Sequence, residues 1–169
     1  PDTAVHVLLD ASGSMSQIQT IANQATVSLA LAIQGIPKCD IAVSMFPGID
    51  GAVSPIVRRG QPVRANLGRF AVNSGGSTPL AEAMLYAVKE LAFSKRQRKV
   101  LIVITDGGPD NGDFVLYLNR LIKGHINTYA IGINSTAVSQ YFEQWSSISD
   151  VAELTQALFT IADQCFELS

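Results

Sequence analysis

The chain has 169 residues, of which 47% are hydrophobic, 15% are charged and 13 are glycine. This length suits one domain, and so high an apolar content excludes intrinsic disorder, while the glycines together with 7 prolines exclude a long coiled coil. No apolar run reaches the ~20 residues that cross a bilayer, and a formal net charge of −2 gives no general attraction to nucleic acid, so we expect neither a membrane span in this segment nor a nucleic-acid partner.

Apolar runs alternate along the chain with segments of helical period, which is the pattern of βα units and a mainly parallel sheet. We expect a hairpin between the second and third strands, because turn-forming residues separate them, and one short helix near 65–70 in an irregular segment over 58–77. The pattern predicts an α/β fold, doubly wound, with a mainly parallel central sheet, helices on both faces and one antiparallel edge strand. We expect residues 1–169 to be a single domain of a longer protein. In chain order, the expected elements are a strand at 4–9, a helix at 17–33, strands at 40–46 and 53–57, a helix at 79–93, a strand at 100–105, a helix at 112–123, a strand at 127–133 and a helix at 151–166.

The two most apolar strands are each followed by an aspartate, Asp10 in one case and Asp106 in the other. Ligands of open α/β sheets bind outside the carboxyl ends of the strands, and a carboxylate is costly to desolvate there without a partner. Ser12 and Ser14 follow Asp10 at alternate positions, and Gly13 between them lets a tight loop direct several oxygen atoms into one space. These residues therefore predict an oxygen-ligand site at this edge.

A third segment, Ser74-Gly75-Gly76-Ser77-Thr78-Pro79, is a glycine-rich loop that presents Thr78 just before a helix. We expect Ser77 or Thr78 also to cap that helix. Together, two carboxylates and three hydroxyls form a hard-cation set that suits Mg²⁺ or Mn²⁺ and is poor for Zn²⁺. Because most of these ligands are neutral, such an ion would keep positive charge and bind an anion from outside, such as a partner's carboxylate.

The pattern Asp10-x-Ser12-x-Ser14, with Thr78 and Asp106-Gly107, resembles the metal-ion-dependent adhesion site of the von Willebrand factor A (VWA) domain family. The resemblance covers essentially the whole chain. It implies that Ser12, Ser14 and Thr78 contact the metal directly and that Asp10 and Asp106 do so directly or through water. We expect Mg²⁺ or Mn²⁺ in preference to Ca²⁺, and a protein partner that presents Asp or Glu to the ion.

The loop sequences Gly-Gly-Ser-Thr-Pro-Leu at 75–80 and Thr-Asp-Gly-Gly-Pro-Asp at 105–110 are most similar to those of intracellular VWA domains. These belong to cobalt- and magnesium-chelatase subunits and to proteins paired with MoxR-type AAA+ ATPases. The resemblance implies a cytoplasmic interaction module that is not itself the catalyst and that serves an AAA+ ATPase or chelatase complex. An extracellular adhesion-type VWA domain shares the motif and stays an alternative.

An enzyme that uses the same metal is the other alternative. A haloacid-dehalogenase phosphatase needs a second aspartate two residues after the first as general acid, and Ser12 stands there. The P-loop string GxxxxGK[ST] does not occur. His6 lies within a predicted buried strand without a nucleophile nearby in sequence, so we expect a paired core histidine. Asp110 and Asp113 could reach the rim of the metal site, but the pattern favours capping of the following helix.

Overall fold

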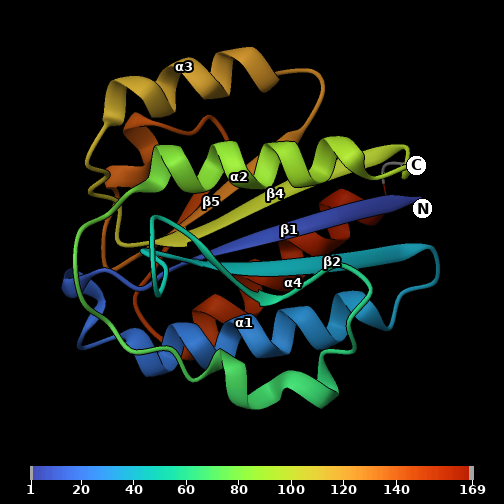
Figure 1. Cartoon of the computed structure of the whole chain (residues 1–169), viewed down its shortest axis with the longest axis horizontal. Helices are drawn as coiled ribbons and strands as arrows, with labels where there is room; N and C mark the ends of the chain where they lie inside the picture. The colour runs from blue at the N-terminus through green and yellow to red at the C-terminus, as the bar shows by residue number, and fades with distance from the viewer. Residues whose placement is uncertain (1, 168–169) are drawn as a thin grey trace.

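A six-stranded sheet in the order β3-β2-β1-β4-β5-β6 forms the centre of the molecule (Figure 1). The computed structural model describes residues 2–167, without the side chains at positions 151, 162 and 164–167. The strands are β1 Thr3–Asp10, β2 Cys39–Phe46, β3 Ser54–Val57, β4 Arg98–Thr105, β5 Asn127–Ile133 and β6 Trp145–Ile148. The helices are α1 Gln19–Gln34, α2 Leu80–Phe93, α3 Gly112–Ile122 and α4 Val151–Glu167, with 3₁₀ turns η1 Gly13–Met15, η2 Arg64–Phe70 and η3 Ala137–Gln140.

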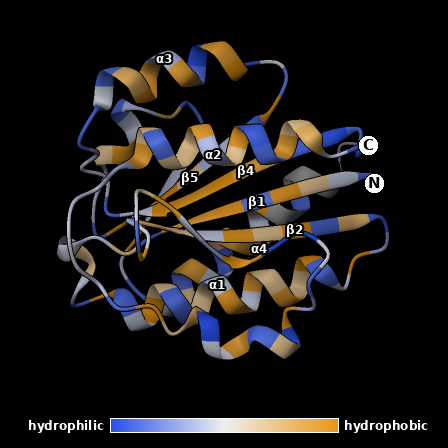
Figure 2. Cartoon of the chain, viewed as in Figure 1, coloured by the Kyte–Doolittle hydropathy of each residue, from blue (hydrophilic) through white to orange (hydrophobic). Residues whose placement is uncertain are grey.

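All strand pairs are parallel except β2 with β3, which is antiparallel at one edge. Helices α1 and α4 cover one face of the sheet, and α2 and α3 cover the other (Figure 1). All eight residues of β1 are buried, because a strand with helices on both faces has no solvent side; Figure 2 shows β1 and β4 hydrophobic along most of their length. The predicted doubly wound α/β fold, with its antiparallel edge strand, is confirmed.

The sixth strand is not predicted by the sequence pattern. β6 has only four residues, two of them serine, and only Ile148 is buried. An edge strand needs a neighbour on one side alone, so β6 forms by pairing with β5 and lacks the apolar run that marks a central strand. Among the described residues, no helix is both long and apolar enough to span a membrane.

A half-buried ionic network fastens the end of α2 to the sheet. His6 of β1 binds Glu90 of α2 through Nδ1 and Ser44 of β2 through Nε2, both at 2.9 Å. Arg59 donates to both carboxylate oxygens of Glu90, at 2.6 and 2.7 Å, and also binds Asp40 at the start of β2. Helix α2 begins near the carboxyl ends of the strands, and this network holds its other end. The network therefore fixes the direction of the helix that follows the Thr78 loop.

The protonation states in this network follow from burial and pairing. Burial lowers the pKa of His6, against the opposing effect of Glu90. Burial alone would raise the pKa of Glu90, but hydrogen bonds from Arg59 and His6 outweigh it and lower that pKa to about 2. In the folded protein His6 is therefore neutral and Glu90 ionised near pH 7. Both groups bind protons more tightly in the unfolded chain. Stability therefore falls as pH drops below 6.5 because of His6, and falls further between 4.5 and about 2 because of Glu90.

We predict that Glu90→Gln lowers the free energy of unfolding at pH 7 by about 2 kcal/mol, because it breaks charge-assisted hydrogen bonds to Arg59 and His6. The variant should also lose less stability than the wild type between pH 5 and pH 3, since it has no carboxylate to protonate. Urea unfolding at several pH values measures both effects. Glu143→Gln is the matched control, because Glu143 pairs with Lys123 while 79% exposed. Equal, small effects of the two substitutions would contradict this account.

Candidate functional site

The carboxyl ends of β1 and β4 lie side by side at the centre of the sheet, and both predicted aspartates are there. The register pairs Leu9 with Ile104, which places Asp10 beside Thr105 and Asp106 one residue further. From this point the chain runs through α1 to β2 on one side and through α3 to β5 on the other. This is the switch point at which α/β sheets bind ligands.

Asp10 is fully buried and its two oxygens have different protein donors. Oδ1 accepts the Ser12 N–H at 2.8 Å, and Oδ2 accepts the Thr105 hydroxyl at 2.6 Å. Burial raises the pKa of Asp10, these hydrogen bonds oppose the shift, and the nearby charge of Asp106 adds to it. A cation bound between the two carboxylates would offset both the burial and the repulsion.

The loop after β1 presents its two serine hydroxyls together. The Oγ atoms of Ser12 and Ser14 are 3.2 Å apart, with Ser12 buried and Ser14 exposed. Neighbouring ligands of an octahedral Mg²⁺ lie about 3.0 Å apart when each bond is about 2.1 Å. The separation of these hydroxyls therefore fits two adjacent ligands of one such ion.

The glycine-rich loop lies along the loop after β1. The Gly13 N–H donates to the Gly76 carbonyl at 3.0 Å, and the Gly75 N–H donates to the Ala11 carbonyl at 2.8 Å. Gly76 has a φ of +83°, a conformation that favours glycine. Two segments more than 60 residues apart in sequence are thus held together through their backbones.

Thr78 is held against the loop that follows β4, and its partner there is Asp110. The Thr78 N–H donates to both carboxylate oxygens of Asp110 at 3.1 Å, and the Asp110 N–H donates back to the Thr78 carbonyl at 3.0 Å. The prediction that Asp110 caps α3 is wrong. Asn111 is the N-cap and its side chain accepts the Phe114 N–H, which leaves Asp110 free to bind Thr78.

The expected cap at the start of α2 is also absent. Pro79 occupies the N-cap position, and the helix has no side-chain cap from Ser77 or Thr78. The Thr78 N–H is instead taken by Asp110, so the Thr78 hydroxyl is not used as a cap. In the part of the chain that the structure describes, neither this hydroxyl nor the Asp106 carboxylate has a hydrogen-bond partner.

The three predicted segments thus meet at one edge and offer hydroxyl and carboxylate oxygens. Among the side chains that the structure describes, no group of three or more His, Cys, Asp or Glu could bind a metal. A site here would therefore depend on hydroxyls, which fits Mg²⁺ or Mn²⁺ and not Zn²⁺. The candidate ligands are Asp10, Ser12, Ser14, Thr78 and Asp106.

Two supporting residues escaped the sequence analysis. Thr105 donates to Asp10 and also accepts the Gly107 N–H at 3.0 Å. Gln19, buried at the start of α1, donates through Nε2 to the Asp10 carbonyl and to the Asn23 side chain, both at 3.1 Å. Neither has a signal in the local sequence, since a threonine ending a strand and a glutamine starting a helix are common.

The Ser44–His6–Glu90 chain has the connectivity of a hydrolase triad, but the site lacks access. Ser44 and His6 are both 1% exposed. Neither lines the cavity beside α3 or the cavity beside the turn between β2 and β3. A nucleophile must reach its substrate. The expectation that His6 is a paired core histidine is confirmed.

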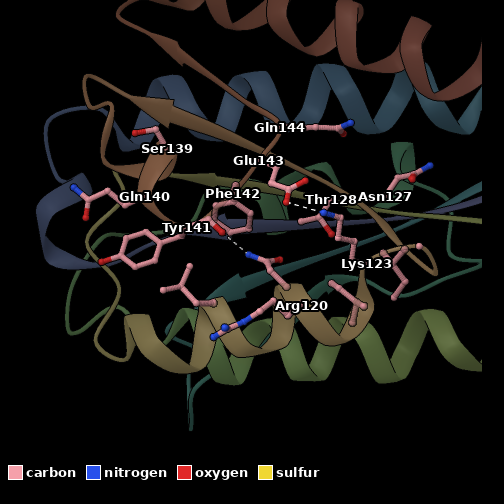
Figure 3. Close-up of a pocket in the computed structure, with 15 residues that line it drawn as sticks. Arg120, Lys123, Asn127, Thr128, Ser139, Gln140, Tyr141, Phe142, Glu143 and Gln144 are labelled. Carbon is pink, nitrogen blue, oxygen red and sulfur yellow. Dashed lines mark hydrogen bonds and ion pairs between the residues drawn. The ribbon is translucent and has the colours of Figure 1, made fainter.

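A cavity of about 560 Å³ lies at the amino end of β5, between α3 and residues 139–144 (Figure 3). Two contacts join its walls: Lys123 Nζ with Glu143 at 2.9 Å, and Asn119 Nδ2 with the Tyr141 carbonyl at 2.6 Å. None of the five candidate ligands lines this cavity, so it is not part of the candidate metal site.

Comparison with known proteins defines the family. The von Willebrand factor type A domain model matches residues 4–165, and the chain belongs to this family. VWA domains are protein-interaction modules, and this is the class of function that the fold and family define. No curated protein sequence matches the chain.

Solved structures agree in fold. The chain is similar to the SpRpn10 VWA domain, with 12% identity, a TM-score of 0.74 and 95% coverage of both chains. It is also similar to the pilus adhesin SpaC from Lactobacillus rhamnosus GG, with 12% identity and a TM-score of 0.80 over 96% of this chain and 30% of that one. BatB, a conserved hypothetical protein from Bacteroides thetaiotaomicron, shows 12% identity and a TM-score of 0.73 over 98% and 99% of the two chains. The chain thus spans less than a third of SpaC, and identities this low show a common fold alone.

We predict that Thr105→Val destabilises the protein by about 1–3 kcal/mol, because it leaves an oxygen of the buried Asp10 carboxylate and the Gly107 N–H without a partner. Thr105→Ser keeps the hydroxyl and should retain most of the stability. Urea unfolding of the two variants without added metal measures the difference. If Thr105→Val is as stable as Thr105→Ser, the hydrogen bond to Asp10 does not stabilise this edge.

Proposed function

We propose that this VWA domain binds its partner through a divalent cation, Mg²⁺ or Mn²⁺. The observation that supports the proposal is the meeting of three separate segments, which carry five oxygen-bearing side chains, at the switch point of the sheet. Asp10, Ser12, Ser14, Thr78 and Asp106 would hold the ion. Ca²⁺ fits less well, because it prefers six to eight oxygen ligands, often with bidentate carboxylates.

The bound ion would supply a centre of positive charge that accepts an anionic oxygen. Asp10 shares its negative charge with the donors Ser12 and Thr105, and the serine and threonine hydroxyls bring no charge. Asp10 and Asp106 would together match the formal charge of the ion, but five protein ligands leave one of the six octahedral positions of Mg²⁺ open for a further oxygen. An Asp or Glu side chain of a partner protein has the charge and the oxygen type that this position requires.

The role that we propose is binding and not catalysis. Ser12 stands where a phosphatase of the haloacid-dehalogenase type needs its second aspartate, and the serine and histidine of the Ser44–His6–Glu90 arrangement are buried. These observations disfavour the enzyme alternative. A phosphatase assay in Mg²⁺ tests it, and we expect no turnover.

The finer proposal is a cytoplasmic accessory role with an AAA+ ATPase or chelatase complex. Its support is the resemblance of the loops at 75–80 and 105–110 to those of chelatase-subunit and MoxR-associated VWA domains. The extracellular adhesion-type alternative draws on the similar fold of the SpaC adhesin. An AAA+ ATPase that coelutes with the wild-type chain in Mg²⁺, and not in EDTA, would favour the first role over the second.

We predict that Mg²⁺ or Mn²⁺ raises the melting temperature of the wild-type chain above its value in EDTA. An ion that binds only the folded state stabilises it by about 2.7 kcal/mol at a hundredfold excess over the Kd. Asp106→Ala should abolish the rise, because it removes an ionised ligand. Thermal melts in EDTA, Mg²⁺, Mn²⁺ and Ca²⁺ measure the effect.

The matched control for this experiment is Asp113→Ala, which removes an exposed aspartate in the first turn of α3. It should leave the response to Mg²⁺ unchanged. The proposal fails if the wild type shows no rise specific to divalent cations, or if Asp106→Ala keeps the full rise.

A further inference from the structure

A second cavity, of about 510 Å³, adjoins the candidate metal site. Its walls are the turn between β2 and β3 on one side and residues 68–75 on the other. Ala11 and Gly75 line it, and these two residues also join the loops of the metal site through the Gly75 N–H and the Ala11 carbonyl. We call it the hairpin cavity. A ligand at the metal site therefore lies next to an open recess.

The lining of the hairpin cavity is mostly apolar. Met45 and Pro47 come from the end of β2, Ile56 from β3, and Val72 from the segment after η2. Ile56 and Val72 are buried, while Met45 and Pro47 are partly exposed. Removing such surface from water is favourable by about 25 cal/mol per Å², so an apolar side chain that entered the recess would bind there.

Ile49, which also lines this cavity, has an exposed side chain on an ordered turn. Its side chain is 80% exposed, yet its N–H donates to Ser54 Oγ at 2.8 Å and the Gly48 N–H donates to the Gly51 carbonyl at 2.8 Å. A Cβ at Gly48 would lie 2.5 Å from Ser54 Oγ, so the turn is tightly closed. The hairpin thus holds a large apolar side chain in solvent beside the recess.

Arg69 adds a positive charge to the lining of the same cavity. Its guanidinium reaches the Ile56 carbonyl only at 3.5 Å, and it forms no ion pair with any side chain that the structure describes. A partner with an acidic side chain for the metal site would bring carboxylates toward this arginine as well. Arg69 is the charged residue in the lining of this cavity, and its positive charge favours an acidic partner segment.

We propose that the domain recognises its partner at two adjoining points. An acidic side chain binds at the metal site, and an aliphatic or aromatic side chain a few residues away enters the hairpin cavity and packs on Ile49. The occupant is an extended, acidic peptide segment of a protein partner with one apolar anchor. This inference rests on the proposed function, because it takes the metal site as the first point.

A random peptide library displayed on phage tests the two points separately. The library is selected on the wild-type chain in Mg²⁺ and in EDTA, and on four variants in Mg²⁺. Asp106→Ala removes the metal site, Ile49→Ser removes the exposed apolar contact, and Ala71→Trp fills the cavity from its lining. Phe93→Ser is the matched control, since Phe93 is 89% exposed at the far end of α2.

The expected result is a set of Mg²⁺-dependent peptides that share an acidic residue with an apolar residue at a fixed offset. Peptides selected on Ile49→Ser or Ala71→Trp should still share the acidic residue but no longer an apolar residue. Selection on Asp106→Ala should give peptides with neither feature. A synthetic copy of the strongest peptide should bind Ile49→Ser and Ala71→Trp about tenfold more weakly and Phe93→Ser as tightly as the wild type.

Different failures point to different errors. Mg²⁺-dependent peptides with an acidic residue and no apolar preference would overturn the second point and leave the proposed function standing. If peptides selected on both Ile49→Ser and Ala71→Trp keep the apolar residue, the second point is likewise overturned and the proposed function stands. The absence of any Mg²⁺-dependent peptide, or apolar peptides bound equally in EDTA, would overturn the two-point proposal, and the melting experiment then decides whether the metal site itself has failed.

Discussion

The hydrogen bond from Thr105 to the buried carboxylate of Asp10 is the contact on which the rest of this edge depends. A carboxylate with no exposed surface is stable only if each oxygen has a donor, and here the donors come from the neighbouring strand and from the chain's own next turn. Meeting this requirement fixes where β1 and β4 end relative to each other. It also fixes the conformation of the Ser12 loop, since the Ser12 N–H must point back at Asp10.

Helix α2 runs from the carboxyl ends of the strands, where Asp10 lies, toward their amino ends. Near its last turn, Glu90 is bound by Arg59 and His6, and just before its first turn Thr78 is bound by Asp110. The helix is thus positioned at both ends by polar contacts and along its length by apolar packing. Because exposed ion pairs contribute little, the half-buried Glu90 cluster does more to hold the helix than a surface pair such as Lys123 with Glu143.

The sequence carried the fold and the candidate ligands because their signals are local. Buried central strands give continuous apolar runs, and Asp10, Ser12 and Ser14 are read within five residues. β6 escaped prediction because an edge strand is defined by its neighbour and not by its own composition. Asp110 does not cap α3 as predicted, since capping preference cannot show that the Thr78 N–H, 32 residues away in sequence, lies within reach and needs an acceptor. Whether the five candidate ligands hold an ion stays a prediction.

The reciprocal bonds between Thr78 and Asp110 have a mechanical consequence. Three hydrogen bonds join two short segments, and they run in both directions, so the joint resists twisting as well as separation. The loop before α2 and the loop before α3 must therefore move as one body. A partner that pulls on the face of the domain would transmit tension through Thr78 into two helices at once, and neither loop would peel away from the sheet alone.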